Sequence, residues 1–221
     1  MKLLTRIACI LLFTAICFCS SSFGDAAASS AVKLLFEKKY SIWKKDLESS
    51  REFLGDDSGT MMGTYDDITA LGIPAIPFIM EKLHEDPSLY LALRKITKKM
   101  WYWDECKMPA DRILINWWSK GQDAVEKKFC ALYENFKEIK SAKKSAEEVK
   151  LLKRFEDLGI AALPYMFEKI SQGELEFMPI VSRLTNGAIT EKNSVNEFIV
   201  WWKKNKNDWL IPFPDQNLYD R

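Results

Sequence analysis

The chain has 221 residues, with 32 lysines and arginines against 31 aspartates and glutamates, a formal net charge of +1 and 48% hydrophobic residues. This balance excludes the concentrated positive charge on which nucleic-acid binding depends. Paired lysines such as Lys127-Lys128 and Lys203-Lys204 are interleaved with acids, a pattern typical of solvated helix faces. We therefore expect no nucleic-acid partner.

Residues 1–24 are typical of a secretory signal peptide. Lys2 and Arg6 form a short basic region, an apolar run follows over residues 7–18, and small side chains then precede Asp25 at the spacing that a signal peptidase requires. A second run of small residues allows cleavage slightly later. The apolar run is too short to cross a bilayer comfortably, and no later stretch reaches the necessary length. The sequence predicts an exported protein, periplasmic or extracellular, with no membrane span in its mature part.

A lipid anchor is the alternative for this leader, because Cys17 and Cys19 lie where a lipid-modified cysteine is found. Lipoprotein signals place a small residue just before that cysteine, whereas Ile16 and Phe18 stand here. We favour cleavage without lipidation. Without the leader, 30 basic and 31 acidic residues remain.

Residues 25–221 have the length of a single domain, which at this size buries about 70% of its unfolded surface without needing disulfides. Two cysteines remain after the leader, Cys106 and Cys130. In an oxidising compartment they either pair or stay as separate thiols, and the sequence leaves both alternatives open.

The sequence contains the same multi-helix unit twice. The repeated segments are residues 71–83 and 158–170, residues 93–97 and 181–185, and residues 113–118 and 197–202. Their offsets of 87, 88 and 84 drift slowly in one order, as a duplication with loop insertions and deletions would produce. We predict unit one over about residues 31–120, unit two over about residues 124–206, and a C-terminal tail over residues 207–221.

Both units are predicted to be helical throughout, with almost no strand. Apolar residues recur at steps of three and four, for example at Val32, Leu35, Phe36, Tyr40, Trp43 and Leu47 and again at Leu89, Leu93, Ile96 and Met100. Hydroxyl and acid pairs predict helix starts at Thr64 with Asp67, Ser145 with Glu148 and Ser194 with Glu197. Prolines open helices at Pro77 and Pro164, and glycines end the preceding ones at Gly72 and Gly159.

A helix that ends in Leu-Gly, then a short turn, then a helix that opens with Ala-x-Pro is similar to a HEAT-type repeat of exported bacterial HEAT-like proteins. Here the motif runs from Leu71-Gly72 to Leu83 and from Leu158-Gly159 to Ile170. Together with the Ile-Thr or Leu-Thr and the Trp-Trp helix that follow it, the resemblance covers about half of the mature chain. The resemblance implies an all-α fold, an α-α superhelix or HEAT-like solenoid, used mainly as an interaction scaffold. Units of about 88 residues exceed an ordinary HEAT repeat, so each is expected to hold additional helices, and the curvature stays open.

The residues that carry chemistry are sparse. His84 is the only histidine, and the sequence context of an acidic helix end favours a surface position over a catalytic base. One histidine and two scattered cysteines do not make a zinc site, and Asp56-Asp57-Ser58-Gly59 lacks the alternating ligands of a calcium loop. No glycine cluster is present to hold phosphates. We predict no catalytic residues, no metal and no cofactor.

Aromatic residues provide the candidate binding sites. The Trp117-Trp118 and Trp201-Trp202 pairs occur in both units and are assigned to the core. Between the shared threonine and the Trp pair the units differ, and only the first contains Trp101, Tyr102 and Trp103, followed by Asp104. This segment either folds over a helix end or binds a partner.

The proline-containing tail, with Trp209 and Phe213, is the second candidate binding site, or else covers an exposed end of the helical array. The leading hypothesis is a non-enzymatic module that binds another protein. A carbohydrate- or envelope-polymer-binding protein is the alternative, and a carboxylate-based hydrolase comes third.

Overall fold

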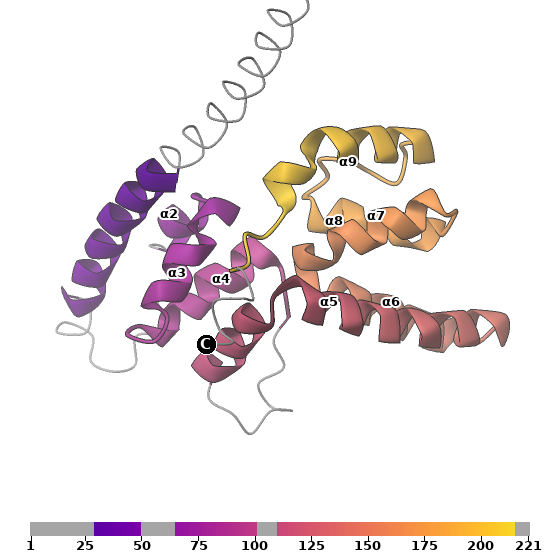
Figure 1. The fold of residues 1–221 in the computed structure, drawn as a ribbon, viewed down its shortest axis with the longest axis horizontal. Coiled ribbons are helices and arrows are strands. Elements are labelled where there is room, and N and C mark those ends of the chain that lie inside the picture. The colour runs from indigo at the N-terminus through magenta and orange to yellow at the C-terminus, as the bar shows by residue number, and fades with distance from the viewer. Residues whose placement is uncertain (1–28, 50–64, 101–109, 215–221) are drawn as a thin grey trace, which may run out of the picture. The chain divides into compact units, whose positions relative to one another are not determined.

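The computed structural model describes residues 29–49, 65–100 and 110–214 (Figure 1). The chain divides into two compact units, Met1–Thr64 and Tyr65–Arg221. The described part of the first is one helix over residues 29–49, on which Phe36 stacks on Tyr40 and Tyr40 lies 5.7 Å from Trp43, ring centroid to centroid. The predicted signal peptide, with Cys17 and Cys19, and the predicted helix start at Thr64 lie outside the described residues.

The described elements of the second compact unit, Tyr65–Arg221, are all helices, which confirms the all-α prediction for this part of the chain. In order they are α2 (Tyr65–Thr69), η1 (Ile73–Ala75), α3 (Ile76–Lys82), η2 (Pro87–Leu89), α4 (Tyr90–Thr97), α5 (Ala110–Ser141), α6 (Ser145–Glu156), η4 (Gly159–Ala162), α7 (Leu163–Ser171), η5 (Leu175–Phe177), α8 (Met178–Leu184) and α9 (Val195–Trp209). Elements labelled η are short 3₁₀ helices. No described helix has the length and apolar character needed to cross a bilayer.

The same order of elements occurs twice along the chain. An α-helix, a 3₁₀ turn, a proline-opened helix, a second 3₁₀ turn and another helix run from α2 to α4 and again from α6 to α8, each followed by a helix with a Trp pair. Pro77 and Pro164 lie in the first turns of α3 and α7, as predicted. Proline is tolerated there because its missing N–H would have no partner inside the helix.

Helix α5 is broken at Gly121, where φ is 59° and ψ is −155° (Figure 1). Only glycine adopts this backbone conformation without a steric penalty. The break separates the Trp117-Trp118 helix from the long helix that packs on α6. Gly121 lies between residues 120 and 124, where the sequence predicts the division of the two units, and that division stays a prediction.

Two predictions about helix ends were wrong. Helix α6 begins at Ser145 itself, with Lys144 at the N-cap and no side-chain cap hydrogen bond, whereas the predicted capping box of Ser194 and Glu197 is present. Helix α4 ends at Thr97, before Met100, because Lys98 adopts a left-handed conformation with φ of 53°. Apolar spacing extends past this point and cannot reveal a backbone reversal.

The core of the second repeat is aromatic. Phe129, Phe136, Phe155 and Phe177 are fully or almost fully buried, and the rings of Phe155 and Phe177 meet edge to face at 5.0 Å. These rings come from α5, α6 and η5, so they join the long helix to the repeat that follows it. Edge-to-face pairs add about 1 kcal/mol beyond the buried area.

The chain after α9 returns to the helix that ends the first repeat. The ring of Phe213 lies 5.0 Å from Trp117 and 5.5 Å from Trp118, and Ile211 is buried. In the second repeat Trp202 instead stacks on Phe167 at 4.5 Å. Equivalent Trp pairs therefore pack on different partners, and Phe213 is used in packing within the chain.

Candidate functional site

Residues 97–100 leave α4 and lie against the turn that contains Gly159, at the junction of the two repeats. The Met100 N–H donates to the Asp157 carbonyl oxygen at 3.1 Å. A Cβ atom on Gly159 would lie 2.3 Å from the Thr97 carbonyl oxygen and 2.7 Å from the Lys99 nitrogen. The two backbones thus meet at a distance that only glycine permits, and we call this place the junction.

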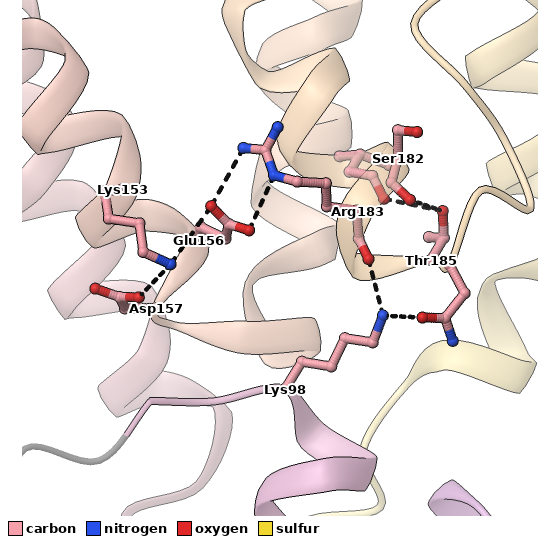
Figure 2. Close-up of polar contacts among 9 residues, drawn as sticks. Lys98, Lys153, Glu156, Asp157, Ser182, Arg183 and Thr185 are labelled. Atoms are coloured by element: carbon pink, nitrogen blue, oxygen red, sulfur yellow. Dashed lines mark hydrogen bonds and ion pairs between the residues drawn. The ribbon is translucent and has the colours of Figure 1, made fainter.

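Lys98 connects the junction to α8 (Figure 2). Its Nζ donates to the Arg183 carbonyl oxygen at 2.8 Å and to Asn186 Oδ1. Asn186 stands 88 residues after Lys98, at the repeat-equivalent position, and is also left-handed with φ of 55°. Burial lowers the pKa of Lys98, and the charge of Glu156 opposes this. Equivalent residues of the two repeats therefore hold each other across the junction.

An ion-pair network lies beside this contact. Arg183 donates to both oxygens of Glu156, at 2.9 and 3.2 Å, and Lys153 Nζ lies 3.1 Å from Asp157 Oδ1 and 3.6 Å from Glu156 Oε2 (Figure 2). Burial raises the pKa of Glu156, but Arg183 and Lys153 outweigh burial and leave that pKa below its usual value. The network joins α6 to α8 close to the junction.

A pocket of about 480 Å³ opens on the Lys98 side of the junction, and we call it the inter-repeat pocket. Its apolar wall comes from both repeats and from the end of α9, and polar side chains also line it. The lining residues are Thr69, Gly72, Ile73, Pro74, Lys95, Ile96, Lys98, Ile160, Leu184, Asn186, Asp208 and Trp209.

A second pocket of about 340 Å³ includes Lys99, and we call it the lysine pocket. It is lined by Lys99, Met100, Lys128, Leu132, Arg154, Asp157 and Leu158. Burial and, to a smaller extent, the charge of Lys128 lower the pKa of Lys99, Asp157 opposes them, and the resulting pKa is about 8. Adjacent lysines, Lys98 and Lys99, thus line two different cavities.

The predicted site residues have different outcomes. Trp101, Tyr102, Trp103, Asp104 and Cys106 lie outside the described residues. Trp209 lines the inter-repeat pocket, with its ring 6.0 Å from that of Trp201.

The remaining predictions concern the disulfide and the absence of a metal. Cys130 is exposed on α5, and its pairing with Cys106 stays a prediction. Within the described ranges, no group of three histidine, cysteine or acidic side chains is placed to hold a metal ion. His84 is exposed, as its sequence context indicates.

Sequence reasoning missed Lys98 and Lys99. The repeats already differ at these positions, because the second has Asn186-Gly187 where the first has Lys98-Lys99. The aromatic side chains of residues 101–106 had instead made that segment the candidate difference between the repeats. The charge difference between the repeats was the signal that could have found the junction.

Comparison with protein-family models, curated protein sequences and solved structures found no match for this chain.

We predict that Gly159→Ala destabilises the fold far more than Gly72→Ala. Both glycines have positive φ, so each alanine costs about 1 kcal/mol in backbone strain. A Cβ at Gly72 meets only Pro74 Cδ at 3.9 Å, whereas one at Gly159 collides with the backbone of residues 97–99. Urea denaturation should show a loss of about 3 kcal/mol or more for Gly159→Ala. Equal losses would contradict the close approach at the junction.

The lowered pKa of Lys99 predicts a pH-dependent stability. Between pH 8 and 10.5 the unfolded chain holds the Lys99 proton more tightly than the folded chain, so the free energy of unfolding rises with pH, by up to about 3 kcal/mol. Lys99→Met should lack this rise and should be more stable than the wild type at pH 7. Denaturation at pH 7 and pH 10 measures the free energy of unfolding of both proteins. Lys127→Met, at an exposed position, is the control. A Lys99→Met effect that does not change with pH would refute it.

Proposed function

We propose that this chain is an exported helical-repeat module that binds another protein, and that the inter-repeat pocket receives an apolar side chain of that partner. The observation that supports this most is a pocket formed by both copies of the repeated element order. A HEAT-like stacked arrangement, as the sequence resemblance implies, is part of the proposal. Stacked repeats characteristically bind partners along a surface shared by neighbouring units.

The composition of the pocket favours a protein partner. Ile73, Ile96, Ile160, Leu184 and Trp209 supply apolar surface. Charged and amide side chains also line the pocket, a combination found where one buried side chain provides much of the binding energy. About 480 Å³ is enough for one large aromatic or aliphatic side chain.

Carbohydrate binding is the second candidate, and Trp209 is the observation that favours it. An aromatic ring beside Asn186 and Asp208 combines a surface for the apolar face of a sugar with groups that bind hydroxyls. The two pockets at the junction each include one carboxylate, Asp208 or Asp157, so they lend no support to a hydrolase that needs a carboxylate pair.

We predict that peptides selected from a display library against the full chain carry an apolar anchor and lose at least about tenfold in affinity with Trp209→Ala. Leu175→Ala is the matched control, because Leu175 is an exposed apolar residue that does not line the pocket. Thr69→Phe, which fills the pocket from α2, should have the same effect as Trp209→Ala. Thermal denaturation checks that each variant folds.

The same proteins tested on a glycan array separate the candidates. Trp209-dependent binding to glycans without peptide binding would replace the protein partner by a sugar. Binding of either class that is equally strong in Trp209→Ala and Leu175→Ala would exclude the pocket as the site.

The proposal of export rests on the sequence of residues 1–24, which has a basic start, an apolar run and small residues before Asp25. We predict that N-terminal sequencing of the protein recovered from an export-competent host begins at Asp25 or within a few residues of it. Reversing the apolar character with Leu11→Arg and Leu12→Arg should keep the chain inside the cell and uncleaved. An intact Met1 terminus on the wild-type protein would contradict export by cleavage.

A further inference from the structure

The Trp201-Trp202 pair of the second repeat has its aromatic partner within that repeat. The ring of Phe167, on α7, stacks on both members of this pair, at 5.8 and 4.5 Å between centroids. At the offset of 87 Phe167 corresponds to Met80, so the first repeat has no ring at that position. Phe213 instead contacts both members of the Trp117-Trp118 pair, at 5.0 and 5.5 Å. The C-terminal segment thus supplies to the first repeat the aromatic contact that the second repeat makes for itself.

The segment that carries Phe213 begins at a wall of the inter-repeat pocket. Residues 210–213, which we call the strap, directly follow Trp209, the last residue of α9 and a lining residue of the pocket (Figure 1). Ile211 is buried, and the Phe213 N–H donates to the Ile211 carbonyl oxygen at 2.9 Å. Four residues of chain reach at most about 14 Å, so a docked Phe213 confines the end of α9.

The position of the Trp209 ring depends on this confinement. The last turn of a helix lacks partners for its carbonyl groups and opens more readily than the turns before it. Here α9 ends with Leu210 in an extended conformation, with ψ of 129°, and the Leu210 N–H donates to the Lys206 carbonyl oxygen at 3.1 Å. The direction in which the strap leaves Leu210 therefore limits how far Trp209 can turn away from the pocket.

The strap also joins the two repeats at the pocket. Trp117-Trp118 lie in the part of α5 that precedes the break at Gly121 and ends the first repeat, whereas Trp209 belongs to the second. A second tie comes from Lys98, which lines the pocket and donates to the Arg183 carbonyl oxygen at 2.8 Å. Because the walls come from different repeats, their separation depends on such ties, and loss of the strap should change the pocket even where the Lys98 tie remains.

We propose that the strap controls the inter-repeat pocket, because the docking of Phe213 on Trp117-Trp118 positions Trp209 as a wall of that pocket. Phe213 does not line the pocket, so it acts through Trp209 as a positioning residue. A docked strap and a ligand that contacts Trp209 then stabilise each other, because coupling between two sites is reciprocal. This coupling to a ligand rests on the proposed function, whereas the positioning of Trp209 does not.

Fluorine NMR of the full chain labelled with 5-fluorotryptophan tests the positioning without any ligand. The signals lost in Trp209→Phe and in Trp202→Phe identify these two resonances. Phe213→Ala should move the Trp209 resonance toward that of solvent-exposed tryptophan, and should leave in place the Trp202 resonance, whose ring stacks on Phe167. Val200→Ala is the control, because it removes an exposed apolar side chain of the same helix and should leave the Trp209 resonance unchanged.

A second variant keeps the test decisive if Phe213→Ala does not fold, which thermal denaturation reveals. Phe213→Leu retains an apolar side chain and should move the Trp209 resonance less, in the same direction. An unchanged Trp209 resonance in a folded variant whose Trp117 and Trp118 resonances move would mean that the strap only covers this pair, and would overturn the proposal. A shift of the Trp202 resonance as large as that of Trp209 would also overturn it, because the change would then be general.

Peptides with an apolar anchor, whose binding to the full chain depends on Trp209, test the coupling. Their affinity should fall at least about fivefold in Phe213→Ala and stay unchanged in Val200→Ala. Equal affinity for the wild type and Phe213→Ala would overturn the coupling. If no such peptide binds the wild type, the proposed function and the coupling fail together, and the Trp209 resonance still decides the positioning.

Discussion

The turn at Gly159 closely approaches the backbone of residues 97–99. The arrangement of the rest of the second compact unit, Tyr65–Arg221, depends on this contact. A carbonyl and an amide of the first repeat lie where any side chain on residue 159 would stand. The Met100 N–H and the Lys98 ammonium then donate to two carbonyl oxygens of the second repeat, those of Asp157 and Arg183. Glycine is therefore required here for packing between repeats as well as for its backbone conformation.

This contact also explains why two adjacent lysines have different environments. Lys98 takes a left-handed conformation, so the chain turns between it and its neighbours, and Lys98 lines the inter-repeat pocket while Lys99 lines the lysine pocket. The ion pairs of Lys153, Glu156 and Arg183 lie beside these two positions (Figure 2). Two pockets and an ion-pair network thus lie where the two repeats meet, a position at which a ligand would contact both.

The sequence predicted the helices and their repeated order because apolar spacing, the prolines of α3 and α7 and the glycines before them act locally. It predicted the end of α4 wrongly, because the left-handed Lys98 is held by Asn186, a contact 88 residues away. Most residues of the candidate site could not be predicted for the same reason, because they meet only through contacts between distant parts of the sequence. Trp209 was found from its type, but Lys99, Lys128 and Arg154 are ordinary surface residues in sequence and gain significance only from being brought together.

The return of the tail to Trp117 and Trp118 bears on how the chain acquires its structure. Solenoid repeats usually need only their neighbours, so each can form as soon as it is synthesised. Here Phe213 packs on a helix made almost a hundred residues earlier, so the packing at the end of the first repeat is not complete until residue 213 has been synthesised.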